Sequence, residues 1–190
     1  MKPNFIFIHS TGGYPEECWY PWLQTELKNL GCKVTIPTFP TPDNQSLDFW
    51  MQVFGPYFEE INENTVLIGR SIGPPFILRV LEKLNKPIKA AFLVAGFCSN
   101  LGLPDFAPLI DSFTEEPFNW EKIKANCKEF HVYHADNDPI VPLAKGQELA
   151  NNLDSEIIII PGAGHFTMSS EYGERFPELL EKIKEMFRDI

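Results

Sequence analysis

The sequence predicts an α/β fold, a three-layer α/β/α sandwich built around a mostly parallel, six-stranded sheet. Two observations support this prediction. Short apolar segments alternate with longer amphipathic segments from one end of the chain to the other. Several of the short segments are apolar at consecutive positions, as at Val66, Leu67 and Ile68, which is typical of strands buried on both faces of a parallel sheet.

Length and composition agree with one globular domain. The chain has 190 residues, so we expect a single domain over residues 1–190. Hydrophobic residues make up 44% of it and charged residues 22%, which excludes a largely disordered chain. Its 26 acidic and 16 basic side chains give a net charge of −10, which disfavours nucleic acids and anionic membranes as partners.

The individual elements follow from the apolar pattern. The short segments have the length and composition of strands, and the stretches between them carry apolar residues three or four positions apart, as amphipathic helices do. Gly31 and Pro142 stand where a helix typically ends and begins. The predicted strands are Phe5–Ile8, Lys33–Ile36, Thr65–Ile68, Ala90–Val94, Phe130–Tyr133 and Glu156–Ile160. The predicted helices are Trp19–Leu30, Ser46–Asn62, Ile72–Leu84, Trp120–Cys127, Leu143–Leu153 and Gly173–Ile190.

The sequence offers no secretion, metal or cofactor signal. The apolar run Phe5–Ile8 is shorter than the ~7–15 residues of a signal-peptide core, and no window approaches the ~20 apolar residues of a membrane span. We therefore expect a cytoplasmic protein with free thiols, without cofactor or metal, because the cysteines lack metal-binding spacing and no nucleotide motif occurs. The four cysteines are Cys18, Cys32, Cys98 and Cys127.

Catalytic residues are expected in the loops after the strands, because ligands of parallel sheets bind beyond the carboxyl ends of the strands. The loop after the third predicted strand, Gly69–Gly73, has the pattern G-x-S-x-G between a strand and a helix, the context of a nucleophile elbow. The chain must reverse there within about two residues, which strains Ser71 and leaves no room for side chains at positions 69 and 73. Ser71 is therefore the predicted nucleophile. Pro74 and Pro75 fall in the first helical turn, where they cost little.

A nucleophilic serine needs a histidine base and an orienting acid, which follow it in this order in such folds. Asp138 lies after the fifth predicted strand and His165 after the sixth, and we expect them to be the acid and the base. Asp136 is the rival acid. His134 is a less favoured base because it precedes the acid, and His131, inside a strand, is expected either to pack or to lie at the surface. The glycines around His165 predict a mobile loop.

An oxyanion hole requires two backbone N–H donors. One is expected from Ile72, directly after the nucleophile. The second is expected from the loop after the first strand, where Gly12–Gly13 allow close approach to a substrate. Thr11 is favoured there, with Ser10 as second choice, and His9 is expected to shape the loop.

With these residues in place, the chain resembles a small α/β-hydrolase, and in particular the compact serine hydrolase family that includes bacterial YdeN and the vertebrate retinoblastoma-binding serine hydrolase. The resemblance implies a minimal α/β-hydrolase fold without a cap domain, and it places the family's nucleophile on Ser71, its acid on Asp138 and its base on His165. The matching stretches are Gly12–Gly13, Trp19–Leu23, Gly69–Gly73, Trp120–Lys124, Asp138–Pro142 and Gly164–Phe166.

The chain departs from this family at some positions. Arg70 stands where the family usually has histidine; it is expected to pair with a carboxylate beneath the elbow or to add positive field near the site. Pro74 and Pro75 replace small residues. The segment Leu30–Val34 lacks the glutamate of an L-x-C-x-E motif, so a retinoblastoma-type partner is not expected.

The predicted activity is hydrolysis of a small ester or amide through an acyl-enzyme intermediate. The alternative is a non-catalytic module of the same fold that acts through protein–protein contacts. The segment Phe97–Asn119, rich in phenylalanine and proline, is the only room for a covering element. It is either a short apolar lid or a segment that packs on the sheet edge.

Overall fold

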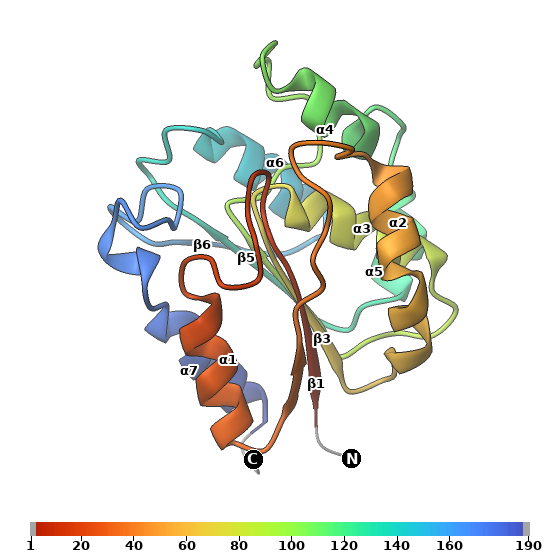
Figure 1. The fold of residues 1–190 in the computed structure, drawn as a ribbon, viewed down its shortest axis with the longest axis vertical. Helices are drawn as coiled ribbons and strands as arrows, with labels where there is room; N and C mark the ends of the chain where they lie inside the picture. The colour runs from red at the N-terminus through yellow and green to blue at the C-terminus, as the bar shows by residue number, and fades with distance from the viewer. Residues whose placement is uncertain (1–2, 188–190) are drawn as a thin grey trace.

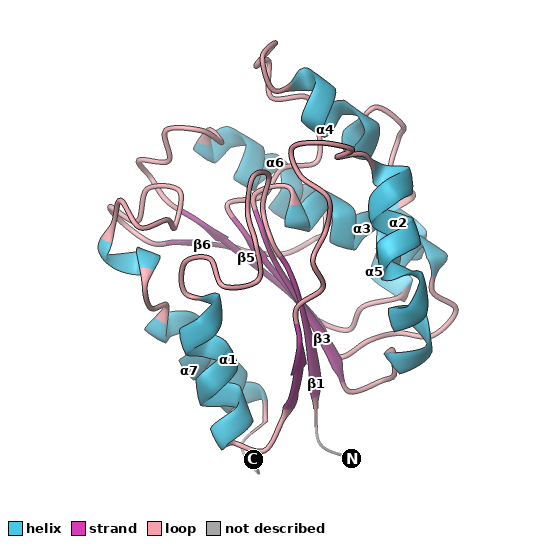
Figure 2. Ribbon diagram, in the orientation of Figure 1, coloured by secondary structure: helices cyan, strands magenta, loops and turns pink. Residues whose placement is uncertain are grey.

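The computed structural model describes residues 3–187, and they form a six-stranded sheet that is parallel throughout, between two layers of helices (Figures 1 and 2). The strand order is β2-β1-β3-β4-β5-β6. All six predicted strands are present, and the third continues two residues beyond its predicted end. Their bounds are β1 (Asn4–Ile8), β2 (Lys33–Thr35), β3 (Thr65–Arg70), β4 (Ala90–Val94), β5 (Phe130–His134) and β6 (Ile157–Ile159).

Seven α-helices and two 3-10 turns lie within the described residues. Figure 1 shows α1 and α7 on one side of the sheet and α2, α3 and α5 on the other. The helices are α1 (Tyr20–Asn29), α2 (Leu47–Phe54), α3 (Gly73–Lys83), α4 (Ala107–Thr114), α5 (Trp120–Ala125), α6 (Leu143–Asn152) and α7 (Pro177–Met186); the 3-10 turns are η1 (Gly55–Glu60) and η2 (Glu171–Gly173). Among residues 3–187, no helix is long and apolar enough to cross a membrane.

The central strands contribute apolar side chains to two hydrophobic cores, one on each face of the sheet. On β1, Phe5 and Phe7 pack in the layer of α1 and α7, while Ile6 and Ile8 pack in the layer of α2, α3 and α6. Successive side chains of a strand point to opposite faces, so a strand covered on both sides is apolar at every position. The burial of strands on both faces, from which a parallel sheet was predicted, is therefore confirmed.

Two helix predictions were wrong in their bounds. The stretch Ser46–Asn62 is not one helix: α2 ends at Phe54, and the 3-10 turn η1 follows, because Pro56 offers no backbone N–H to continue an α-helix. The last helix begins at Pro177 instead of residue 173, since proline disfavours helical geometry in the residue before it. The predicted end of that helix at Ile190 lies outside the described residues.

The helix α4 was not predicted from the sequence. It lies within Phe97–Asn119, which is rich in proline and phenylalanine, and these residues obscure a helical period. Pro108 falls in its first turn, where the missing N–H has no helical partner to lose. The short α4 therefore forms despite the proline content.

Candidate active site

The chain reverses at Ser71, between the end of β3 and the start of α3. Ser71 has a φ of 61°, in the left-handed region that residues other than glycine rarely adopt, and its N–H donates to the Val94 carbonyl at 3.0 Å. Holding a residue in this region costs on the order of 1–3 kcal/mol, so the surrounding structure must enforce it. The expected strained turn is thus present at the predicted nucleophile.

Glycine is required on both sides of this turn. A Cβ atom added to Gly69 would lie 2.8 Å from the backbone carbonyl carbon of Gly73. A Cβ atom added to Gly73 would lie 2.8 Å from the carbonyl oxygen of Ile8. Both distances are shorter than real Cβ contacts, so the expected collision at these two positions is confirmed. The helix α3 can approach β1 and β3 this closely only with glycine there.

Asp138 and His165 meet although they come from different loops. Asp138 follows β5 and His165 follows β6, and His165 Nδ1 lies 2.8 Å from Asp138 Oδ2. The other carboxylate oxygen accepts the N–H groups of Ile140 at 2.9 Å and Val141 at 3.0 Å. Burial on its own would raise the pKa of Asp138, but the hydrogen bonds and the charge of His165 bring it below its usual value. The carboxylate is therefore ionised and oriented.

Asp136, the rival acid, holds the loop of His165 rather than its ring. Asp136 Oδ1 accepts the N–H of Gly162 at 2.9 Å, and Asn137 Oδ1 accepts the N–H of Gly164 at 2.8 Å. The two glycines have φ values of 75° and 56°, which explains why glycine stands there. The side chains of Asp136 and Asn137 connect the loop of His165 to the loop that follows β5.

Two other histidines, His131 and His134, lie in β5 and do not line the cavity beside Ser71. His134 Nε2 lies 2.9 Å from the Val141 carbonyl oxygen and 3.8 Å from Asp138 Oδ2, and burial lowers its pKa. The ring of His131 lies 4.6 Å from that of Phe92, and burial lowers its pKa to about 4. Both are therefore neutral near pH 7, and His131 packs against Phe92.

His9 shapes the loop after β1. Its Nε2 accepts the Phe39 N–H at 2.9 Å, so the ring proton is on Nδ1, which donates to the Ser10 carbonyl oxygen at 3.0 Å. The Ser10 N–H is engaged by the Glu17 carboxylate at 3.0 Å. Within residues 3–187, the N–H groups of Thr11 and Ile72 have no hydrogen-bond acceptor. Of the two oxyanion candidates in this loop, only Thr11 thus has its N–H available.

A cavity of about 200 Å³ connects these groups. Ser71, His165 and Thr11 all line it. In the described part of the chain, the Ser71 hydroxyl makes no hydrogen bond to the His165 ring; such bonds are commonly long before substrate binds. The complete lining is Ser10, Thr11, Glu17, Arg70, Ser71, Phe97, Leu101, Leu103, Phe106, Ile110, Ile140, His165 and Thr167.

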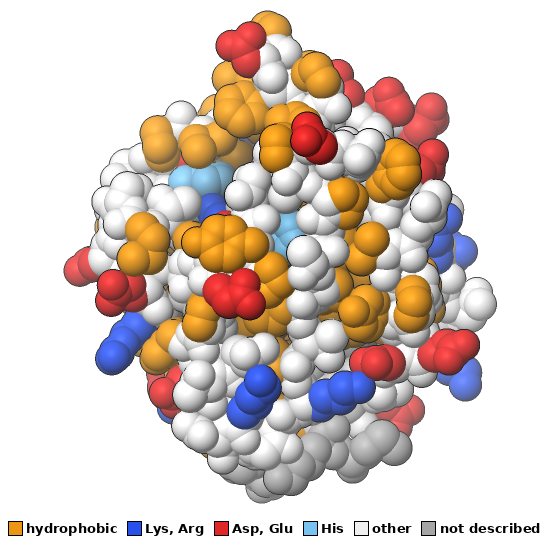
Figure 3. All heavy atoms as spheres, viewed as in Figure 1, with side chains coloured by type: hydrophobic (Ala, Val, Ile, Leu, Met, Phe, Trp, Pro, Cys, Tyr) orange, Lys and Arg blue, Asp and Glu red, His pale blue; other side chains and the backbone are white. Residues whose placement is uncertain are grey.

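The segment Phe97–Asn119 both lines the cavity and packs on the core. Its first half supplies an apolar wall of the cavity, and Phe113 of α4 is fully buried in the core. Hydrophobic side chains gather over α4 at the top of the molecule in Figure 3. Gln45 connects this segment to the loop after β1, because its Nε2 donates to Thr11 Oγ1 at 2.8 Å and to the Leu109 carbonyl at 2.7 Å. The segment is thus connected to the loop that carries Thr11.

Arg79 of α3 holds the other end of this segment. Its Nε donates to the Phe113 carbonyl at 3.0 Å and its Nη1 to the Pro117 carbonyl at 3.3 Å, while Nη2 donates to the Glu116 carbonyl. Its guanidinium carbon lies 3.9 Å from the ring centroid of Phe118. One buried guanidinium thereby fixes the chain between α4 and α5.

Replacing Arg79 with methionine is expected to lower the free energy of unfolding by about 2–4 kcal/mol, because the carbonyl groups it binds lose their partner. Urea denaturation measures the effect. Lys124→Met is the matched control: it removes a cation whose ion pair with Asp154 is exposed on both sides, and a change below ~1 kcal/mol is expected. Equal losses in the two variants would contradict the anchoring role.

Comparison with known proteins supports the class that the geometry indicates. A parallel sheet that presents a strained serine and a buried acid–histidine pair at one edge is the arrangement of α/β hydrolases. The chain belongs to the serine hydrolase family, whose model matches residues 5–185. The predicted resemblance is therefore confirmed, and the protein is a serine hydrolase.

Relatives of known sequence or structure match most of the chain. It is 31% identical over 168 residues to YdeN of Bacillus subtilis (strain 168), a match that covers 87% of each chain. It is 29% identical over 172 residues to the serine hydrolase RBBP9 of Rattus norvegicus, covering 88% of this chain and 86% of that one. The crystal structure of the B. subtilis ydeN gene product has a TM-score of 0.91 at 28% identity, covering 99% of this chain and 100% of that one.

Proposed function

We propose that this serine hydrolase cleaves small apolar carboxylic esters through an acyl-enzyme intermediate on Ser71, with His165 as general base and Asp138 as its orienting acid. One observation carries the proposal: the cavity beside the strained Ser71 is also lined by His165, whose ring is held at 2.8 Å by the buried Asp138. Nucleophile, base and acid then occupy the roles of a hydrolytic triad.

The chemical steps follow from this placement. Ser71 Oγ attacks the ester carbonyl while His165 Nε2 takes its proton, and Asp138 stabilises the imidazolium through Nδ1–H. The alcohol leaves with that proton. Water then attacks the acyl-enzyme with His165 again as base, which releases the carboxylic acid and restores the serine. The free N–H groups of Thr11 and Ile72 bind the oxyanion, and each such donor contributes roughly 10²–10³ in rate.

The cavity supports a short acyl group. Its volume of about 200 Å³ is below the ~300–1,000 Å³ typical of drug-sized ligands. Beyond the polar groups at Ser71, the wall consists mostly of apolar side chains from the segment that includes α4. Such a wall stabilises an alkyl chain by burial. The two charged residues of the lining, Arg70 and Glu17, are paired with each other.

We expect kcat/KM to rise about fourfold per added methylene from acetate to butyrate esters, since each buried methylene contributes ~0.8 kcal/mol. Acyl chains longer than butyrate exceed the cavity, so their kcat/KM does not rise further.

Phe106→Ala removes one side chain of the cavity wall and is expected to halve the gain in kcat/KM per methylene. Initial rates on a series of p-nitrophenyl esters measure this. Phe49→Ala is the matched control, because Phe49 is similarly exposed (46% against 42%) but does not line the cavity. A flat series, or equal effects of the two variants, would contradict the acyl-pocket assignment.

The proposed function is tested by covalent labelling with a fluorophosphonate probe, which reacts with activated serines. We expect one probe per chain, located on the Ser71 peptide by mass spectrometry, and no labelling of His165→Ala. Labelling on another residue would overturn the choice of nucleophile. An unlabelled, folded wild type would leave the non-catalytic binding module as the better reading of the same fold.

A further inference from the structure

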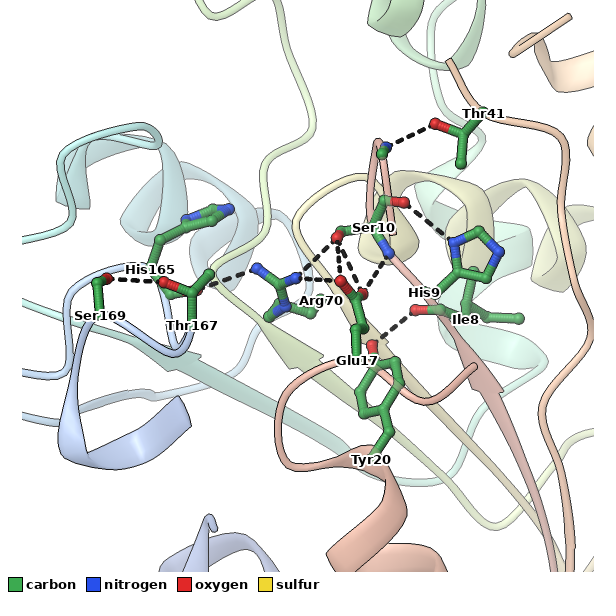
Figure 4. Close-up of polar contacts among 11 residues, drawn as sticks. Ile8, His9, Ser10, Glu17, Tyr20, Thr41, Arg70, His165, Thr167 and Ser169 are labelled. Carbon is green, nitrogen blue, oxygen red and sulfur yellow. Dashed lines mark hydrogen bonds and ion pairs between the residues drawn. The ribbon is translucent and has the colours of Figure 1, made fainter. Parts of the chain in front are cut away.

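Arg70, the residue before Ser71, forms a buried ion pair with Glu17 (Figure 4). Arg70 Nη2 lies 2.9 Å from Glu17 Oε2, and their side chains are only 3% and 9% exposed. Both residues also line the cavity that contains Ser71. The carboxylate expected beneath the elbow is therefore Glu17, which no motif in the sequence marks.

The pair joins three loops of the site (Figure 4). Arg70 itself ends β3 at the elbow, and its Nη1 donates to the His165 carbonyl oxygen at 3.2 Å. Its Nη2 donates to Ser10 Oγ at 2.7 Å, and Glu17 accepts both the N–H and the hydroxyl of Ser10. One guanidinium thus contacts the elbow's strand, the loop that carries Thr11 and the loop that carries His165.

Gly13 leaves the space that the Glu17 side chain of this pair occupies. A Cβ atom added to Gly13 would lie 2.6 Å from Glu17 Oε1, so glycine there gives the carboxylate its place. Arginine suits the centre of the network because its planar guanidinium donates in several fixed directions at once. A lysine ammonium is a single point charge and cannot hold the same acceptors with the same geometry.

The ion pair also affects the positive charge that forms on the His165 ring during the reaction. Within a buried site a guanidinium acts over a longer range than in water, and the Glu17 carboxylate neutralises it. Without Glu17, the Arg70 cation would oppose protonation of the His165 ring, on which the mechanism depends. The remaining ionisable groups facing His165 are Asp138, at 2.8 Å, and His134, whose pKa burial lowers.

Three further titratable groups face the ion pair itself. Burial lowers the pKa of His9 and raises the pKa values of Cys18 and Tyr20, so all three are neutral near pH 7. None of them compensates the charge of Arg70 when Glu17 is removed. The charge balance around His165 is consequently set by Asp138, Arg70 and Glu17.

We propose that Arg70 and Glu17 act as a positioning pair for catalysis: together they fix the Thr11 and His165 loops against the elbow, and Glu17 neutralises the Arg70 cation beside the base. The inference rests on the proposed function, because it assigns these residues an effect on the Ser71–His165 reaction. In the described structure, neither side chain hydrogen-bonds to Ser71 or to the His165 ring.

The electrostatic part is tested by Glu17→Gln, which keeps an oxygen acceptor but removes the charge. The acid limb of the kcat/KM–pH profile is expected to move to lower pH by about one unit, because the uncompensated cation disfavours the protonated imidazole. In Glu17→Gln/Arg70→Gln both charges are absent, and the limb is expected to return to its wild-type position while kcat stays low. If the pair had only a structural role, the acid limb would not move in Glu17→Gln and return in the double variant.

The positioning part is tested by Arg70→Lys, which keeps the charge but loses the branched donor geometry. We expect kcat to fall at least about tenfold, with KM changed less than about threefold and the acid limb unmoved. Ser10→Ala is the milder variant, because it removes the hydroxyl contacts and leaves the Ser10 N–H bonded to Glu17; a kcat loss of about three- to tenfold is expected.

Circular dichroism and fluorophosphonate titration report the folded, competent fraction of every variant, so that a folding defect is not counted as a kinetic one. If Glu17→Gln does not fold, Ser10→Ala and Arg70→Lys still decide the inference. An unmoved acid limb in folded Glu17→Gln, or wild-type kcat in Arg70→Lys and Ser10→Ala, would overturn it. A wild type that is not labelled at Ser71 would instead show that the proposed function is wrong, and the inference would fall with it.

Discussion

Ser71→Ala is expected to lower kcat for a short-chain ester by about 10⁶, with KM changed little. The variant keeps the cavity and the free N–H groups of Thr11 and Ile72, so it still binds substrate. It has no oxygen to form the acyl-enzyme, and only the residual effect of binding and the oxyanion donors remains, roughly 10³–10⁴ over water. Steady-state kinetics on p-nitrophenyl butyrate, with probe labelling of the same preparation, measure both losses.

Ser99→Ala is the matched control for this experiment. Ser99 Oγ accepts from Lys145 at 2.6 Å and donates to Glu148 at 2.7 Å, and it does not line the cavity of Ser71. Its kcat is expected to stay within twofold of wild type. Retention of activity in Ser71→Ala above a few per cent would exclude Ser71 as the nucleophile.

Asp138→Asn is expected to lower kcat by about 10⁴ without unfolding the protein. The asparagine oxygen can still accept the N–H groups of Ile140 and Val141, so the loop keeps its form. Its amide nitrogen then faces His165 Nδ1 and donates to it, which places the ring proton on Nε2, toward Ser71. The histidine can no longer take the serine proton, and the rate falls by tautomer reversal. Kinetics against pH, with urea denaturation on the same samples, separate this loss from instability.

Asp136→Asn is the control that distinguishes the two aspartates. Asp136 accepts only the Gly162 N–H in the described structure, and an asparagine oxygen can accept it as well. A kcat within about tenfold of wild type is expected. Should Asp136→Asn prove the more damaging of the two, the assignment of the acid would have to be exchanged.

Much of the fold was predictable because parallel strands buried on both faces have a simple sequence pattern. The runs Phe5–Ile8 of β1, Val66–Ile68 of β3 and Ala90–Val94 of β4 are apolar at every position, and the structure places these strands in the centre of the sheet. The elbow was predictable for a different reason. Its geometry is local, and the need for glycine at positions 69 and 73 is visible in five consecutive residues.

The parts that were missed or left open depend on residues far apart in the chain. The helix α4 is held by Arg79 and Gln45, whose side chains reach it across more than thirty and more than sixty residues, respectively. The different uses of Asp136 and Asp138 depend on where the Gly162–His165 loop returns beside them. No spacing within one segment carries this information.

By itself, then, the sequence determined the parallel sheet, the strained serine, and an acid and a histidine in later loops of the same edge. Each of these is encoded by short-range sterics or by periodicity along a single segment. Only the tertiary structure decided which aspartate contacts His165, that Glu17 is the partner of Arg70, and how the segment with α4 lines the cavity. Those choices arise from packing and from pairing of buried charges, which bring together residues whose separation in sequence shows no pattern.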